Sequence, residues 1–201
     1  MNLLRYDAIA IGDLDLLLGP TVLQQRIAEA EFPVLSANVQ LAGEETLLAD
    51  PYVILTRGDH HIGIIGVTWD AADVSPDQFT VLKAEDVLAH YVPEVAQQAD
   101  IIIVLSTMGF EEDQALSFEV SDADLFVGGR SRVPLPESWR NPETGALVVQ
   151  AGSQGEWIGQ RVLSLDSSGV VTAHQDQLIL LTDSYPDDPE MRSFLDNYPA
   201  Q

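Results

Sequence analysis

The stretch 101–127, IIIVLSTMGFEEDQALSFEVSDADLFV, decides the fold class of this chain. Its first five residues are all apolar, which is typical of a strand that is buried on both faces. The acidic segment over 110–119 predicts a short helix, and Asp124-Leu125-Phe126-Val127 predicts the next strand. This succession of apolar strands and amphipathic helices indicates an α/β layered fold.

The same alternation extends in both directions from this stretch. Pro20 suits the first turn of a predicted helix, and Pro93 predicts a kink or break in the helix over 84–98. Arg57-Gly58-Asp59-His60-His61 separates two apolar runs and predicts a hairpin turn. The other predicted elements are helices at 20–30 and 191–197, strands at 7–11, 33–39, 52–56, 62–67, 148–151, 161–165 and 170–181, and turns at 153–155 and 167–169.

The length and composition predict one domain over residues 1–201. With 201 residues, of which 46% are hydrophobic, the chain can bury a single core. The sequence has no cysteine, which excludes disulfides and thiolate chemistry. No run approaches the ~18 apolar residues of a membrane helix, and the N-terminus lacks the pattern of a signal peptide, so we expect no membrane span and leave the compartment open.

The charge balance is strongly acidic. Thirty-two acids and nine bases give a formal net charge of −23, and Lys83 is the only lysine. Such a surface repels nucleic acid and anionic lipid, so we expect neither as a partner. A cation-rich role, adaptation to high salt and the ordinary solubility of an acidic protein are the alternatives for this charge.

Several motifs occur in an order that is typical of one enzyme family. Gly12-Asp13-Leu14-Asp15-Leu16 follows the first predicted strand. The other motifs are Phe32-Pro33-Val34-Leu35-Ser36-Ala37-Asn38-Val39, Gly63-Ile64-Ile65-Gly66-Val67-Thr68, 100–110, Gly128-Gly129-Arg130-Ser131-Arg132 and Gln150-Ala151-Gly152. Together they resemble the 5'-nucleotidase-type (calcineurin-like) metallophosphoesterases. The resemblance implies a double β-sheet sandwich flanked by helices, and a phosphatase site that holds two divalent metal ions.

The residues that would carry out this chemistry differ from the family pattern. Asp13 stands where the family has a metal-bridging Asn, and Leu14 replaces the His that protonates the leaving group. Thr107, Arg130 and Arg132 replace metal-binding His residues. Arginine offers only N–H donors and a permanent positive charge, so it cannot coordinate a cation. We therefore expect no metal cofactor and no catalytic residue, with Leu14 and Asp15 as degenerate catalytic positions.

The resemblance also implies that the family domain is incomplete. The chain matches about the C-terminal two thirds of one catalytic domain and starts downstream of the family's early Asp-x-His segment. Without the first strands, a sheet edge or an apolar face would be uncovered. We therefore expect a protein partner or a homo-oligomer that covers the exposed sheet edge.

Four hypotheses for function follow. The first is a catalytically inactive phosphoesterase-like protein that acts as a structural or binding subunit. The second is a metal-dependent phosphohydrolase completed by a partner chain. The third is an anion or phosphate sensor that uses Arg130, Ser131 and Arg132, because guanidinium groups suit phosphate oxygens. The fourth is a truncated gene product without a selected role. The alternative to an anion sensor is that Arg130 and Arg132 pair with acids such as Asp13 or Asp15.

The histidines and serines carry weaker predictions. His60 and His61 are adjacent, so their side chains should point in opposite directions rather than share a metal. His90 is expected at the surface, and His174 has no evident partner. Ser106 and Ser131 lack a nearby histidine in the sequence, which argues against a serine hydrolase. Trp139 and Trp157 fit either a partner surface or the core.

Overall fold

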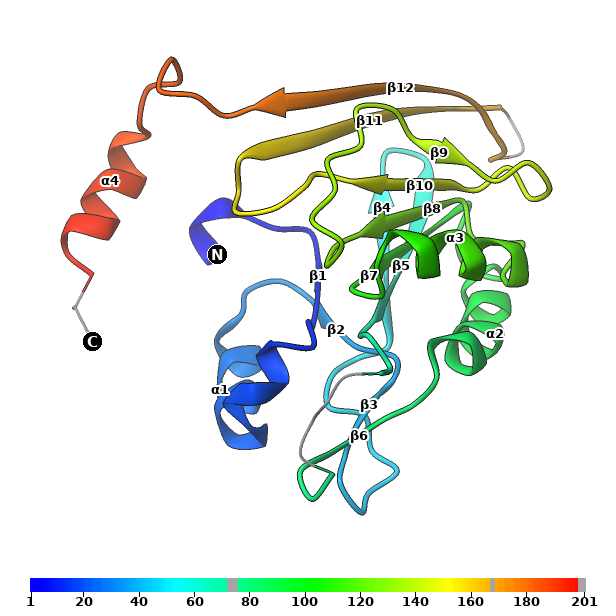
Figure 1. Cartoon of the computed structure of the whole chain (residues 1–201), viewed down its shortest axis with the longest axis horizontal. Coiled ribbons are helices and arrows are strands. Elements are labelled where there is room, and N and C mark those ends of the chain that lie inside the picture. The colour runs from blue at the N-terminus through cyan, green and yellow to red at the C-terminus, as the bar shows by residue number, and fades with distance from the viewer. Residues whose placement is uncertain (72–75, 167–168, 199–201) are drawn as a thin grey trace.

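The computed structural model describes residues 1–71, 76–166 and 169–198. At its centre is a six-stranded mixed sheet (Figure 1). In spatial order its strands are β4 (Tyr52–Arg57), β5 (His60–Val67), β7 (Ile101–Ser106), β8 (Leu125–Gly128), β10 (Leu147–Gln150) and β9 (Trp139–Arg140). The four inner strands run parallel, whereas the edge strands β4 and β9 run antiparallel to their neighbours.

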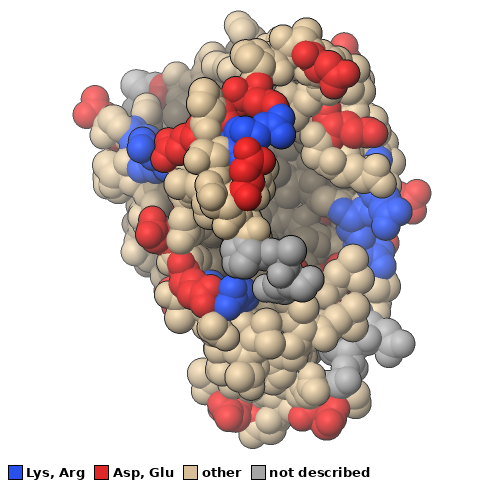
Figure 2. Space-filling model, turned by 90° about the vertical axis from the view of Figure 1, so that its left-hand side faces the viewer, with Lys and Arg blue, Asp and Glu red and all other residues tan. Residues whose placement is uncertain are grey.

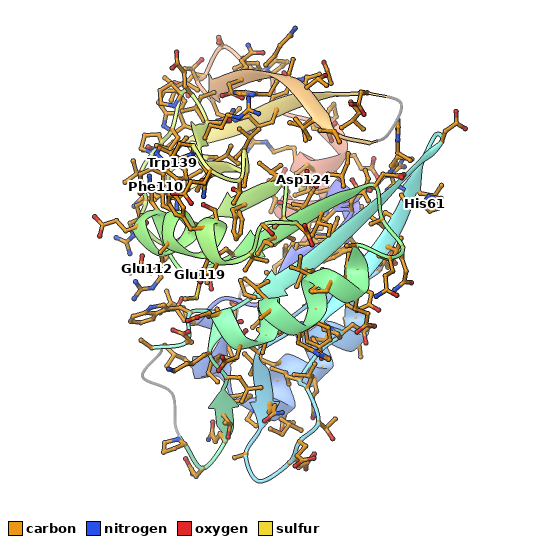
Figure 3. All side chains as sticks on the ribbon, turned by 90° about the vertical axis from the view of Figure 1, so that its right-hand side faces the viewer. His61, Phe110, Glu112, Glu119, Asp124 and Trp139 are labelled. Carbon is orange, nitrogen blue, oxygen red and sulfur yellow. The ribbon has the colours of Figure 1, made fainter. Side chains whose placement is uncertain are left out.

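Two helices cover one face of this sheet. α2 (Ala84–Val95) and α3 (Phe110–Glu119) lie on the same side of the strands (Figures 1 and 3). Their apolar residues pack with those of the inner strands into the largest core cluster, in which Leu88, Val104 and Phe126 are fully buried. The predicted α/β layered fold is therefore confirmed.

Within the described residues, the remaining strands form three two-stranded sheets rather than one continuous second sheet. β1 (Ile9–Ala10) pairs with β2 (Val34–Leu35), β3 (Val39–Leu41) with β6 (Phe79–Val81), and β11 (Trp157–Leu165) with β12 (Val171–Leu180). Gly66 lets β2 approach β5, since a Cβ there would lie 2.7 Å from the Leu35 carbonyl oxygen.

The helices outside the central layer lie mostly on its other side. η1 (Asn2–Leu4), η2 (Asp15–Leu18) and α1 (Pro20–Glu29) belong to the N-terminal region. α1 lies on the side of the sheet away from α2 and α3, and α4 (Pro189–Asp196) stands beyond the β11–β12 hairpin (Figure 1). Within residues 1–71, 76–166 and 169–198, no helix has the length and apolar character needed to cross a membrane.

Most predicted elements are present, but four details were wrong. The predicted strand over 33–39 is split into β2 and β3, because the Asn38 side chain bonds the backbone of Thr68 in both directions, at 2.6 and 2.8 Å. The predicted turn over 57–61 is shorter, since His60 and His61 belong to β5.

The other two corrections concern the burial of β7 and the C-terminal end of α2. Ile103 and Leu105 in β7 are only half-buried, so this strand is not fully buried on both faces. α2 continues past Pro93 and ends at Val95 rather than at residue 98. The sequence patterns missed β6 and β9, which are short, and the predicted turn over 167–169 lies partly outside the described residues.

Candidate functional site

Four loops meet at the edge of the central sheet where its parallel strands end. They follow β1, β5, β7 and β8 and carry Asp13, Trp69, Thr107 and Arg130, respectively. Ligands in open α/β sheets bind at this edge. The loop after β1 is held there because its Ile11 carbonyl accepts a 2.8 Å hydrogen bond from the Thr68 hydroxyl.

Arg130 connects three of these loops. Its Nε lies 3.6 Å from Asp13 Oδ2, and the centre of its guanidinium lies 3.3 Å from the centroid of the Trp69 ring. This arrangement confirms that Arg130 pairs with an acid of the first loop. We refer to Asp13, Trp69 and Arg130 as the loop cluster. A guanidinium stacked on an indole beside a carboxylate has its charge partly offset, but it keeps its positive charge and its N–H donors.

The neighbouring predicted site residues have local structural roles. The Thr107 hydroxyl accepts a 3.2 Å hydrogen bond from the Trp69 backbone N–H. The Asp15 carboxylate accepts one from the Gly12 N–H at 2.8 Å and so closes the turn after β1. Leu14, at the predicted position of the catalytic acid, is 69% exposed and projects into solvent.

Ser131 and Arg132 differ in their contacts. The Ser131 hydroxyl accepts a 2.6 Å hydrogen bond from the Phe110 N–H at the start of α3, where Gly109 has no side chain to cap the helix. Among the described residues, Arg132 makes no hydrogen bond or ion pair. Arg130 and Arg132 both have positive φ, at 64° and 60°, a conformation that is uncommon for residues other than glycine.

A second polar cluster lies beneath these loops, inside the protein. The buried Ser106 hydroxyl donates a 2.5 Å hydrogen bond to Asp113 Oδ1 and accepts one from the Met108 N–H at 3.1 Å. Asp113 Oδ2 and both amide atoms of the buried Gln150 lack hydrogen-bond partners among the described residues. We refer to Ser106, Asp113 and Gln150 as the buried cluster. It joins the ends of β7 and β10 to the first turn of α3.

The environment of Asp113 is unfavourable for a charge. Burial raises the pKa of its carboxyl from 3.8 to about 7, with a smaller contribution from Glu112, while the hydrogen bond from Ser106 and the nearby Gln150 amide act in the opposite direction. The sequence did not single out Asp113, because three consecutive acids at the start of a helix are expected on electrostatic grounds. Its helical spacing from the buried Leu116 and Ser117 is the signal that could have identified it.

The histidines lie elsewhere, and two predictions about them were wrong. His60 and His61 do not point apart, since Nδ1 of each lies within 4 Å of Asp100 Oδ2, at 3.9 and 3.8 Å. His61 is at the end of the sheet away from Phe110 (Figure 3). His174 has a partner, because its Nε2 lies 3.7 Å from Asp176 Oδ2. His90 is exposed, as expected.

Trp139 and Trp157 are half-buried. Trp139 packs against the main core cluster and contacts the Phe118 ring at 6.1 Å between centroids. Of the two alternatives, a partner surface or the core, Trp139 therefore belongs to the core.

The loop cluster does not fit a pair of divalent metal ions. Asp13 is the single carboxylate in it, and its charge is directed to a guanidinium that has no lone pair for a metal. Within the described residues, no group of three or more His, Asp or Glu side chains is arranged to hold a metal ion. The arrangement can neutralise a carboxylate, or offer guanidinium N–H groups to an anion.

Known proteins resemble the chain over its whole length. No protein-family model matches the sequence. The human 5'-nucleotidase is 33% identical over 233 residues and the bovine one 34% over 234 residues, covering 100% of this chain and 41% of each relative. The chain thus spans about two fifths of the length of these curated relatives.

Solved structures agree with the sequence comparison. A 5'-nucleotidase precursor from Thermus thermophilus aligns with a TM-score of 0.85 at 30% identity, over 96% of this chain and 42% of that one. The calcineurin-like phosphoesterase YfkN from Bacillus subtilis aligns with a TM-score of 0.84 at 22% identity, over 98% of this chain and 72% of that one. Along its whole length, the chain is homologous to part of the 5'-nucleotidases, and it has the fold of the calcineurin-like phosphoesterases.

Proposed function

We propose that this chain is a catalytically inactive 5'-nucleotidase-like protein that acts as a structural or binding subunit. The observation that carries the proposal is the position of Arg130, which pairs with Asp13 and stacks on Trp69 at the edge of the sheet where ligands bind. A fixed guanidinium at this place repels a metal ion.

The residues around Arg130 support the absence of catalysis in two ways. A two-metal phosphatase uses its ions to hold the phosphate and to activate water. At the positions that the resemblance matches to metal ligands, Thr107 and Arg132 supply no imidazole. A leaving group also needs a proton donor, and the exposed side chain of Leu14 cannot provide one.

A binding role is supported by apolar side chains that face solvent next to this cluster. Leu14, Leu17 and Leu18 are 69%, 71% and 54% exposed within a single short segment. Figure 2 shows the face of the molecule on the α1 side, which is hollowed and carries small groups in which acidic and basic side chains lie side by side. Exposed apolar residues that are adjacent in this way mark interaction sites. We therefore infer a protein partner, or a second copy of the chain, at this surface.

Two measurements test the proposal. The purified chain, incubated with AMP or an aryl phosphate and Mn²⁺, Zn²⁺ or Co²⁺, should release no phosphate, and elemental analysis should find no bound metal. Metal-dependent turnover that disappears in the Asp13→Ala variant would overturn the proposal. Sedimentation should show a complex or an oligomer that the Leu17→Glu variant weakens, whereas a monomer at all salt concentrations would exclude self-association.

The second candidate is a phosphohydrolase that a partner chain completes. It is favoured by the similarity to nucleotidases along the whole chain, although the chain spans only 41% of the human and bovine relatives. It predicts that turnover appears when the partner is added and that the activity needs a metal. Turnover by the complex would distinguish it from the first candidate, for which the complex stays inactive.

A further inference from the structure

We propose that Arg130 is the centre of a binding site for a phosphate-type dianion, which takes the place of Asp13 at the guanidinium. The inference rests on the proposed function, because only a site without metal leaves Arg130 available to an anion. Inorganic phosphate and the phosphate group of a monoester share the chemistry that such a site recognises.

The first support is the incomplete pairing of Arg130. Its 3.6 Å separation from Asp13 is longer than a hydrogen bond, and its side chain is 36% exposed. In the described part of the chain, the guanidinium makes no hydrogen bond. It therefore keeps its N–H donors for an acceptor with better geometry, and a phosphate can accept two of them in parallel.

The second support is the surrounding structure. The ring of Trp69, 3.3 Å from the guanidinium centre, fixes the plane of that group before any ligand arrives. Arg132 lies two residues away, has no polar contact among the described residues and adds a second positive charge to the same loop. Both arginines keep a positive φ, and backbone strain of this kind often occurs at ligand sites.

Neighbouring acids limit the strength of the site. Asp13 competes directly for Arg130, and the Glu112 carboxylate lies near Ser131, because both would contact a Cβ built on Gly109, at 2.9 and 3.2 Å. The formal net charge of −23 also repels anions at long range. Binding should therefore be weak, on the order of millimolar, and stronger when Asp13 is neutralised.

The experiment is a titration of tryptophan fluorescence at constant ionic strength, with chloride as the balancing anion. Inorganic phosphate should produce a saturable change in the full chain, and the Trp69→Phe variant should lose most of it, since Trp139 and Trp157 lie elsewhere. The Asp13→Asn variant should bind about two- to fivefold more tightly, the range expected for removing one partly exposed ion pair.

Matched variants identify the residues involved. Arg130→Gln should abolish the change, whereas Arg26→Gln, which removes an exposed arginine paired with Glu29 on α1, should leave it intact. AMP is titrated in parallel. Equal affinity for AMP and phosphate assigns the site to the phosphate group alone, and tighter binding of AMP assigns it to a monoester.

Two results would overturn the inference. One is the absence of a saturable change beyond that of chloride in both the natural chain and the Asp13→Asn variant. The other is binding that persists in Arg130→Gln. Release of phosphate from AMP would overturn the proposed function instead, so the two failures are distinguishable.

Discussion

The loop cluster and the buried cluster contain the same kind of group, a carboxylate, in opposite environments. Asp13 lies at the surface beside a guanidinium and an aromatic ring. Asp113 is fully buried, has a serine and a glutamine for neighbours, and has no hydrogen-bond partner for Oδ2 among the described residues. Paired charges at a surface contribute little to stability, whereas an unpaired buried charge is costly. Charge in the buried cluster should therefore have the larger effect on stability.

The largest expected effect is the pH dependence that Asp113 creates. Because burial raises its pKa from 3.8 to about 7, the folded chain binds one more proton than the unfolded chain between these values. The contribution of Asp113 to stability should be greatest below pH 4, should fall by about 1.4 kcal/mol per pH unit as the pH rises toward 7, and should level off above it, a total of about 4 kcal/mol.

The Asp113→Asn variant separates this contribution from those of other acids. Its amide cannot ionise, so denaturant unfolding between pH 4 and 8 should lose that slope, and the variant should become the more stable protein at pH 8. If the free energy of unfolding changes with pH in the same way in both proteins, the ionised Asp113 carboxylate does not destabilise the fold.

The next effect comes from Gly128, which lies against the buried cluster. A Cβ at this position would be 2.3 Å from Asp113 Oδ2 and 2.7 Å from Gln150 Nε2, both of which are held in the core. Gly128→Ala should therefore destabilise the fold by about 2–3 kcal/mol in chemical denaturation.

Gly129 provides the matched control at the surface. A Cβ there would lie 3.6 Å from its nearest neighbour, the Ser106 carbonyl oxygen, which is ordinary contact. Gly129→Ala should change stability by less than about 0.5 kcal/mol. Equal effects of the two substitutions would mean that the buried cluster can rearrange as easily as the loops.

A smaller effect is expected at the contact between the two regions. Ser131 belongs to the surface loop, but its hydroxyl caps α3, which carries Asp113. Ser131→Ala should destabilise the chain by about 1 kcal/mol, and Ser131→Thr should retain most of the stability, because a threonine hydroxyl can accept the same bond. Thermal unfolding of both variants measures the difference, and an unchanged midpoint for Ser131→Ala would show that water replaces the cap.

The two regions also differ in how far the sequence predicted them. The α/β order followed from apolar periodicity, since runs such as Ile101–Ser106 and the helix over 110–119 are strongly patterned. The pairing of Arg130 with an acid of the first loop followed from charge, because a few bases are distributed among many acids. Trp69 was not predicted as the third member, since stacking depends on how two loops far apart in sequence approach one another.

The buried cluster could not be predicted for a related reason. Asp113 is adjacent to two other acids that face solvent or the helix end, and only the packing of α3 on the sheet decides which of them is buried. The contact of His60 and His61 with Asp100 was missed similarly, because side-chain alternation does not describe the end of a hairpin next to another loop.

Removing Arg130 should have an effect no larger than that of Ser131→Ala, and it tests the comparison from its other side. Arg130→Gln deletes a half-exposed ion pair and a stacking contact, each worth at most about 1 kcal/mol. It leaves Asp13 without its partner at a partly exposed position, where water can solvate the carboxylate. The free energy of unfolding should therefore fall by about 1 kcal/mol at low salt, and the difference should shrink in ~1 M NaCl, since salt screens surface pairs. A loss as large as that of Gly128→Ala, unaffected by salt, would mean that the loop cluster stabilises the fold as an internal cross-link rather than as a surface contact.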